Sequence, residues 1–113
     1  MKQPKLYLSH IIKAIDTIQE YLKGFSHDDF LKDEKTQDAV IRNLEIIGEA
    51  SSKLEQEFIK QLPQIPWRDI KDFRNKLIQD YWELNLEVIW EAATKEIPEL
   101  KKLLEPVTER LKD

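Results

Sequence analysis

The stretch Asp72-Phe73-Arg74-Asn75-Lys76-Leu77-Ile78-Gln79-Asp80-Tyr81 has the pattern of an amphipathic helix. Apolar residues recur at spacings of three and four, which predicts one apolar stripe formed by Ile70, Phe73, Leu77 and Tyr81. Arg74 and Asn75 lie beside or within that stripe. A polar group near a buried surface costs on the order of several kcal/mol unless it is paired. We therefore expect the rest of the chain to act as a scaffold for the polar groups of this helix.

Composition favours a small all-α protein. The chain has 113 residues, 35% of them charged, with two glycines and no cysteine. Long stretches without Gly or Pro predict a single all-α domain over residues 1–113. The absence of cysteine excludes disulfides, cysteine zinc sites and a cysteine nucleophile. No segment has the pattern of a signal peptide or a membrane span, so a cytoplasmic location is expected.

The net charge of −4 limits the possible partners. A domain that binds long nucleic acid normally has a basic face that makes on the order of six or more phosphate contacts. An acidic chain of this size is not expected to have such a face. A small cleft that touches one or two phosphates remains compatible with the charge.

Capping signals and periodicity predict the helices. The expected order is a helix over 5–23 ending before Gly24, a short helix over 26–32, a long helix over 35–61, and a helix from Trp67 to about Tyr81. Ser26 and Asp29 form a capping-box pattern, and Asn85 is expected to cap a fourth main helix. Pro98 suits the first turn of a fifth helix, which Pro106 should kink or shorten.

The expected helix over 35–61 suggests a dimer. Its seam has a heptad-like spacing, formed by Val40, Leu44, Ile47, Ser51, Leu54 and Phe58. A helix of that length would extend roughly 40 Å. No other helix of the chain is long enough to cover it, so part of it is expected to pack against a second copy.

Polar residues and a glycine gather in the middle of this helix. Gly48 costs about 1 kcal/mol relative to Ala in a helix interior, which predicts the close approach of another backbone there. Glu45 and Glu49 lie four residues apart on one face, with Arg42 nearby. Two interpretations stay open: a solvated acidic face, or a carboxylate that orients Arg74.

Spacing constrains how the polar residues of the opening helix could act together. Tyr81 follows Arg74 by seven residues, so the two would lie nearly in line on a helix, whereas Arg74 and Gln79 would lie about 140° apart. Joint action of Arg74 and Gln79 would need the helix to unwind near Gln79 or a second protomer to complete the site. A polar network that only fixes helix packing is the competing interpretation.

His27 is expected to be an exposed surface histidine, and Trp67, Trp82 and Trp90 to be core or interface aromatics.

The pattern Arg-Asn-x-Leu-Ile-x-x-Tyr at 74–81, with Ile65-Pro66-Trp67 before it and Leu86-Glu87-Val88-Ile89-Trp90 after it, resembles the HepT-like branch of the HEPN superfamily. The segment 38–50, with its Ile-Gly-Glu-Ala run, resembles the long second helix of that family. The resemblance covers nearly the whole chain.

The resemblance implies a HEPN-type antiparallel bundle of four to five helices that dimerises through its helices. It also implies an endoribonuclease toxin of a type VII-like toxin–antitoxin pair, which cleaves RNA, with tRNA as the expected substrate, without metal or other cofactor. The implied partner is a nucleotidyltransferase of the MntA type, which transfers AMP to a tyrosine of the toxin.

The family motif places an arginine, a histidine and a tyrosine, and here Arg74 and Tyr81 match its first and last positions. Asn75 matches the usual residue after the arginine, and Gln79 occupies the histidine position. By resemblance Arg74 would bind the scissile phosphate, Asn75 would orient the site, and Tyr81 would accept AMP. Glu49 and Arg42, which lie near each other on the expected helix over 35–61, are predicted as supporting residues.

Gln79 departs from the motif in a way that matters chemically. A glutamine amide forms hydrogen bonds but does not titrate, so the chain is expected to be crippled as a nuclease. Three explanations stay open: an engineered inactive form, a natural degenerate copy, or replacement of the histidine by another group. Two alternatives to a ribonuclease also stay open: a non-catalytic HEPN dimer that is the substrate or docking partner of a nucleotidyltransferase, and a purely structural helical dimer.

Overall fold

The computed structural model describes residues 3–111, apart from the side chain of Trp82, and this part of the chain contains helices and turns but no strand. The helices are α1 (Pro4–Tyr21), α2 (His27–Leu31), α3 (Glu34–Ser52), α4 (Gln56–Lys60), α5 (Trp67–Gln79), α6 (Leu86–Glu91) and α7 (Ile97–Arg110). A 3₁₀ turn, η1, covers Tyr81–Glu83, and a π-helical segment, η2, covers Ala92–Glu96. The all-α prediction is confirmed.

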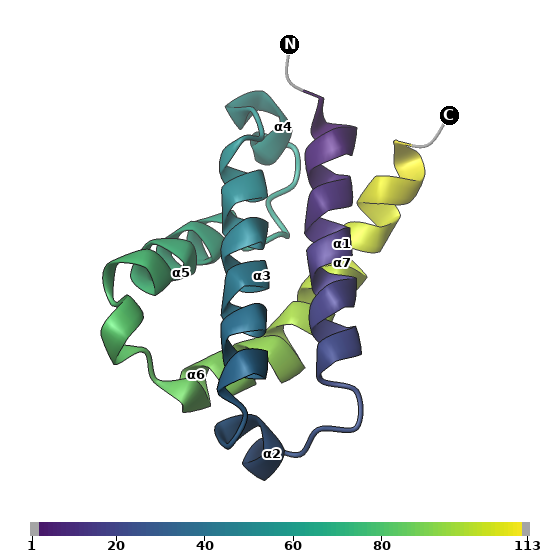
Figure 1. Ribbon diagram of the computed structural model, residues 1–113. Helices are drawn as coiled ribbons and strands as arrows, with labels where there is room; N and C mark the ends of the chain where they lie inside the picture. Colours follow the sequence, from purple (N-terminus) through teal and green to yellow (C-terminus); the bar gives the residue numbers. More distant parts are fainter. Residues whose placement is uncertain (1–2, 112–113) are drawn as a thin grey trace.

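The long helices α1 and α3 run side by side in opposite directions and form the centre of the molecule (Figure 1). The apolar stripe of α1 is buried against α3 and α7. The residues at less than 2% exposure include Leu8, Ile11, Ile15 and Ile18 of α1, Val40 of α3 and Leu104 of α7. An ion pair of 2.8 Å between Lys101 Nζ and Asp16 Oδ1 joins α7 to α1 at the surface.

Local signals set the connection between α1 and α3 as predicted. Gly24 has φ +80°, which places it in the left-handed region that glycine adopts without strain. The Ser26 side chain accepts a hydrogen bond from the Asp29 amide, and the Asp29 carboxylate accepts one from the Ser26 amide, at 3.1 and 3.0 Å. This capping box begins α2, and the buried Phe30 anchors it in the core.

The predicted long helix over 35–61 is wrong in its second half. Helix α3 ends at Ser52, the chain turns, and α4 is a separate short helix. Leu54 in the turn and Leu62 after α4 are both 5% exposed, so the chain buries apolar residues on both sides of this short helix. With 19 residues, α3 is matched by the 18 residues of α1. The length argument for a dimer therefore falls away.

The chain after Asn85 is helical through α6, η2 and α7. Asn85 caps α6 by accepting a hydrogen bond from the Glu87 amide, as predicted. Pro98 lies in the first turn of α7, and the π-helical segment lies directly before it. Such a segment relieves the clash between a proline ring and the carbonyl four residues earlier. Pro106 does not end α7, which continues to Arg110.

Within residues 3–111, no helix has both the length and the apolar character that crossing a membrane requires.

Candidate functional site

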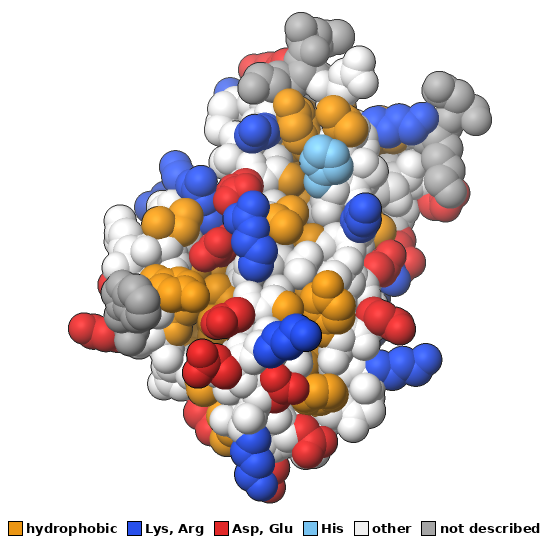
Figure 2. Space-filling model, in the orientation of Figure 1, with side chains coloured by type: hydrophobic (Ala, Val, Ile, Leu, Met, Phe, Trp, Pro, Cys, Tyr) orange, Lys and Arg blue, Asp and Glu red, His pale blue; other side chains and the backbone are white. Residues whose placement is uncertain are grey.

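Helix α5 lies beside α3 (Figure 1), and more than half of its residues are exposed. Leu77 is its one buried residue, while Phe73, Arg74 and Asn75 are half-buried. Figure 2 shows hydrophobic side chains reaching the surface on the side that α5 forms. The helix therefore combines a narrow buried edge with a broad accessible face.

Arg74 meets α3 at Gly48. A Cβ atom built on Gly48 would collide with Cβ and Cγ of Arg74, so any residue larger than glycine would push the arginine away. The prediction that Gly48 marks a close approach is confirmed, although the approaching group is the base of a side chain rather than a backbone. This contact places the stem of Arg74 against the surface of α3.

The guanidinium of Arg74 is incompletely paired. Its Nη1 atom lies 3.5 Å from the side-chain oxygen of Asn75, at the outer limit of a hydrogen bond. Its Nε atom is buried and has no hydrogen-bond acceptor within residues 3–111. Leaving such a donor unsatisfied costs about 1–3 kcal/mol. The arrangement suits an anion that supplies the missing acceptor.

The acidic residues of α3 do not orient Arg74. The Nη1 atom of Arg42 lies 3.1 Å from Glu49 Oε1 and 3.4 Å from Glu45 Oε1. The hydrogen bond to Glu49 is the main reason that the pKa of Arg42 is raised, and Glu45 adds to it. The suggestion that one of these carboxylates pairs with Arg74 is wrong, because both are engaged along their own helix by Arg42. The charge of Arg74 is left for another partner.

Helix α5 ends at Gln79, two residues earlier than predicted. Asp80 has φ −107° and ψ 29°, and Tyr81 lies in the 3₁₀ turn that follows. The seven-residue alignment of Arg74 and Tyr81 on one continuous helix therefore does not hold. Gln79 is exposed at the end of the helix, and Tyr81 is 42% exposed. Both side chains are accessible to a macromolecular partner.

Two hollows flank α5. One has a volume of about 490 Å³ and lies between α3, α4 and α5, with Gly48, Trp67 and Lys71 in its lining. The other has a volume of about 710 Å³ and lies between α3, α5 and α7, with Ile70, Phe73 and Lys76 in its lining. The first hollow has the more polar wall and borders the point where Arg74 meets Gly48.

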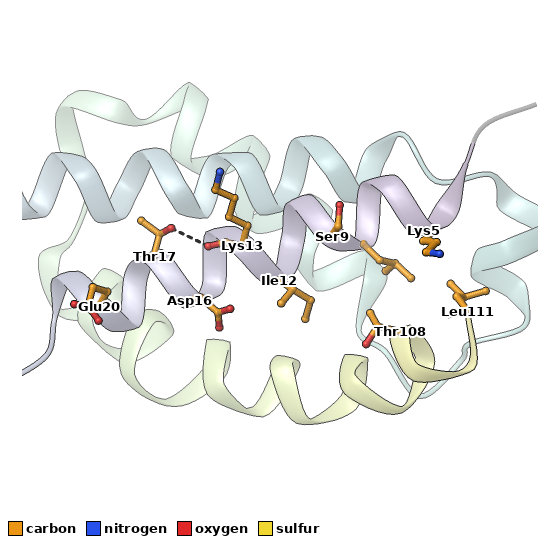
Figure 3. A pocket seen from close by; sticks show the side chains of 10 residues that line it. Lys5, Ser9, Ile12, Lys13, Asp16, Thr17, Glu20, Thr108 and Leu111 are labelled. Carbon is orange, nitrogen blue, oxygen red and sulfur yellow. Dashed lines mark hydrogen bonds between the residues drawn. The ribbon is translucent and has the colours of Figure 1, made fainter. Parts of the chain in front are cut away.

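A third hollow, of about 670 Å³, lies away from these residues between α1 and α7 (Figure 3). Its rim carries Lys5 and Lys13 but also Asp16 and Glu20.

Within residues 3–111, no group of three or more His, Asp or Glu side chains is placed to hold a metal ion.

Two aromatic positions differ in their surroundings. His27, predicted to be an exposed surface residue, is half-buried: its ring stacks on Trp90 at 5.5 Å, and its Nε2 lies 2.6 Å from Glu87 Oε2. Trp90 also contacts Phe30, as expected of a core aromatic. Trp67 instead lines the hollow beside Gly48, and its Nε1 donates a hydrogen bond to the carbonyl of Leu62 at 3.1 Å. The spacing of apolar residues in the sequence could not show whether Trp67 lies in the core or in the wall of this hollow.

The fold and the site together define a class: an all-α protein in which one helix presents a partly enclosed, incompletely paired arginine beside an accessible amide and tyrosine. The chain belongs to the HepT-like ribonuclease family, because the family model described as "Ribonuclease HepT-like" matches residues 11–107. The resemblance inferred from the motif residues is thus confirmed.

Curated relatives carry matching names. The chain is 42% identical over 112 residues to the "Putative RNase TTE0752" of Caldanaerobacter subterraneus, covering 99% of this chain and 100% of the relative. It is 45% identical over 97 residues to the "Probable ribonuclease HepT" of Thermococcus cleftensis, covering 86% and 88% of the two chains. It also matches half of a longer protein of Methanocaldococcus jannaschii, "Gamma-glutamylcyclotransferase and putative RNase MJ0434", at 42% identity over 110 residues. No solved structure was found to match the chain.

Proposed function

We propose that this chain is the ribonuclease-type toxin of a toxin–antitoxin pair and that its own form of the site binds RNA but cleaves it poorly. The observation that carries the proposal is the buried Nε of Arg74, which lacks an acceptor within residues 3–111. A scissile phosphate would supply that acceptor and would form charge-assisted hydrogen bonds with the guanidinium. Membership of the HepT-like ribonuclease family makes RNA the expected source of the phosphate.

In the cleavage step that we propose, the ribose 2′-hydroxyl attacks the adjacent phosphorus and the bond to the 5′-oxygen breaks. The products are a 2′,3′-cyclic phosphate and a 5′-hydroxyl. Arg74 stabilises the charge that builds on the phosphate oxygens, and Asn75 orients the guanidinium. One proton must leave the 2′-hydroxyl and one must reach the 5′-oxygen. Gln79 cannot move either proton, because its amide does not titrate near neutral pH.

Restoring a titratable group tests the proposal. Gln79→His introduces an imidazole with an ordinary pKa of about 6.5. Proton transfer by such a group is worth about 10²–10⁴ in rate, so the variant should cleave RNA in the presence of a chelator. Cleavage is followed on tRNA and on single-stranded RNA, with detection of the cyclic phosphate.

Two variants serve as matched controls. Gln79→Asn keeps an amide at this position, and the double variant Gln79→His with Arg74→Ala lacks the side chain that would bind the phosphate. Both should stay inactive. If Gln79→His leaves every RNA intact, the ribonuclease proposal is wrong for this chain.

A second candidate function follows from the non-titrating Gln79 and the exposed Tyr81. The chain would then be a non-catalytic partner and substrate of a nucleotidyltransferase of the MntA type. The phenolic oxygen of Tyr81 would attack the α-phosphorus of ATP, releasing pyrophosphate and the phenolic proton. AMP on Tyr81 would add negative charge and bulk near the end of α5.

Mass spectrometry of the intact chain tests this candidate. Incubation with ATP and the nucleotidyltransferase encoded by a neighbouring gene should add mass in steps of one AMP, and Tyr81→Phe should abolish the gain. Tyr7→Phe is the matched control and should leave it unchanged. A gain that persists in Tyr81→Phe would assign the modification to another residue.

A homodimer belongs to the same proposal. Its support is the family resemblance and the 710 Å³ hollow between α3, α5 and α7, which is lined largely by apolar side chains. Sedimentation equilibrium should give twice the chain mass, and a mass equal to one chain would overturn the proposed homodimer.

If Arg74→Ala changes only stability and never RNA binding, the chain is instead a structural helical protein.

A further inference from the structure

We propose that the 490 Å³ hollow between α3, α4 and α5 is a subsite for a nucleotide of single-stranded RNA adjacent to the phosphate held by Arg74. The inference rests on the proposed function, and it specifies which face of α5 the RNA follows. It rests on three features of the hollow: its position next to Arg74, its cationic edge and its aromatic wall.

The hollow borders the proposed phosphate site directly. Gly48 forms part of its lining and is also the residue that contacts the stem of Arg74. The Nη1 atom of Arg74 lies on the side of Asn75, and Asn75 follows Lys71 by one helical turn. A strand held at the guanidinium would therefore pass into the hollow when it continues toward the start of α5.

Two cations of α5, Arg68 and Lys71, line the hollow together with one carboxylate, Asp72, and Arg74 lies next along the helix. Arg68, Lys71 and Arg74 occur at intervals of three residues, so they are neighbours on the helix surface and rise about 4.5 Å at each step. We call these three residues the α5 cation strip. Lys71 forms no ion pair with a described residue, and Arg68 has only a weak one, since its Nε lies 4.0 Å from the Asp72 carboxylate.

The wall of the hollow offers an aromatic face. Trp67 is half-buried, and the hydrogen bond from its Nε1 to the Leu62 carbonyl fixes the indole ring. An indole in a hollow beside cations is the combination that binds single strands, because bases stack on aromatic rings while cations hold the backbone. Gln56, which also lines the hollow, carries an amide that can both donate to and accept from a base edge.

The other flank of α5 provides the contrast. The hollow that contains Phe73 and Lys76 is larger, but its lining carries four carboxylates and two lysines, whereas the 490 Å³ hollow is lined by one carboxylate, Asp72, with Arg68 and Lys71. The carboxylates of the larger hollow would repel a phosphate backbone. Lys71 and Lys76 therefore form a matched pair, one lysine on each flank of the same helix, and only Lys71 belongs to the α5 cation strip.

The experiment measures the binding of a labelled single-stranded RNA, on the order of ten nucleotides, by fluorescence anisotropy at several salt concentrations. The unaltered chain serves as the reference, because its Gln79 should permit binding without rapid cleavage. Lys71→Ala and Arg68→Ala should each weaken binding and reduce the slope of log affinity against log salt by about 0.7. Lys76→Ala should leave the slope unchanged. Asp72→Asn removes a negative charge from the lining of the hollow and should tighten RNA binding. A gain in affinity is a change that loss of folding would not produce.

Tryptophan fluorescence reports on the wall independently. RNA binding should quench part of the emission through stacking on Trp67. Trp67→Phe should keep an aromatic face and still bind RNA, but it should lose that part of the quenching. Persistence of the full quenching in Trp67→Phe would overturn the subsite.

The outcomes separate this inference from the proposed function. If the unaltered chain binds no RNA, the proposed function fails and the subsite fails with it. If RNA binding depends on Arg74 but Lys71→Ala and Lys76→Ala behave alike, the proposed function stands and the subsite is overturned. Weaker binding confined to variants of the α5 cation strip supports the subsite.

Discussion

Helices α3 and α5 lie side by side but differ in how much of each is buried. Buried positions of α3 recur along its whole length and include Val40, Leu44 and Ile47, whereas α5 buries only Leu77. The first helix is stabilised mainly by apolar packing with α1, and the second presents polar groups to solvent and to possible ligands. Stability is therefore carried mainly by α1 and α3, whereas the proposed chemistry is assigned to α5, which meets α3 where Arg74 contacts Gly48. Substitutions should be able to alter one without the other.

The largest expected effect lies in the packed helices. Ile15→Ala should lower the free energy of unfolding by about 2–5 kcal/mol, because Ile15 is fully buried and its truncation leaves a cavity between α1 and its neighbours. Ile78→Ala makes the same change at a half-exposed position of α5 and should alter this free energy by less than about 0.5 kcal/mol. Urea unfolding of both variants measures the difference.

RNA affinity provides the second readout for this pair of variants. Ile15→Ala should bind RNA as the unaltered chain does at temperatures well below its unfolding midpoint. Equal losses of stability in the two variants would mean that the face of α5 that carries Ile78 is covered in solution, and the distinction between the helices would then fail.

An intermediate effect is expected at the junction of the two helices. Gly48→Ala forces a methyl group into the stem of Arg74. Overpacking costs about 1–3 kcal/mol, while the higher helix propensity of Ala returns about 1 kcal/mol. The net loss of stability should be at most about 2 kcal/mol, and RNA affinity should fall because the guanidinium is displaced.

Gly24→Ala is the control for this prediction. Its methyl group would meet no atom within 4 Å, but φ +80° is strained for alanine. That strain costs about 1–2 kcal/mol, with no expected change in RNA affinity. Comparable loss of RNA binding in both variants would show that Gly48 acts through stability alone.

The same division explains what the sequence could predict. Gly24, the Ser26–Asp29 capping box and the Asn85 cap are local signals, and the structure contains all three. The end of α3 at Ser52 has no comparable signal, because residues 49–61 contain neither Gly nor Pro. Leu54, Leu62 and Ile65 are buried on the two sides of α4, and which residues beyond α3 enter the core depends on the whole fold.

The sequence motif nominates the residues of the candidate site, and their roles stay a prediction; their contacts could not be predicted. The motif residues of 74–81 identified Arg74, Asn75, Gln79 and Tyr81 without any geometry. The pairing of Arg42 with the α3 carboxylates and the unpaired Nε of Arg74 depend on how helices far apart in sequence pack. Arg68 and Lys71, which the proposed subsite adds, were not among the predicted residues, although they lie at three-residue spacing from Arg74.

The smallest expected effect concerns the capping box at the start of α2, which belongs to the scaffold and lies outside the α5 cation strip. The hydrogen bond from the Ser26 amide is the main cause that holds the pKa of Asp29 below its ordinary value of 3.8, with a further contribution from the Ser26 side chain. The ionised carboxylate therefore stabilises the fold above about pH 4, and this contribution is lost as pH falls through the lowered pKa. Asp29→Asn keeps an oxygen that can accept the hydrogen bond but removes the charge. Thermal unfolding should show the variant slightly less stable than the unaltered chain at neutral pH, with the gap closing below pH 4. RNA affinity should be the same in both at neutral pH, and a gap in stability that persists at pH 2 would assign the effect to side-chain geometry rather than to the charge of Asp29.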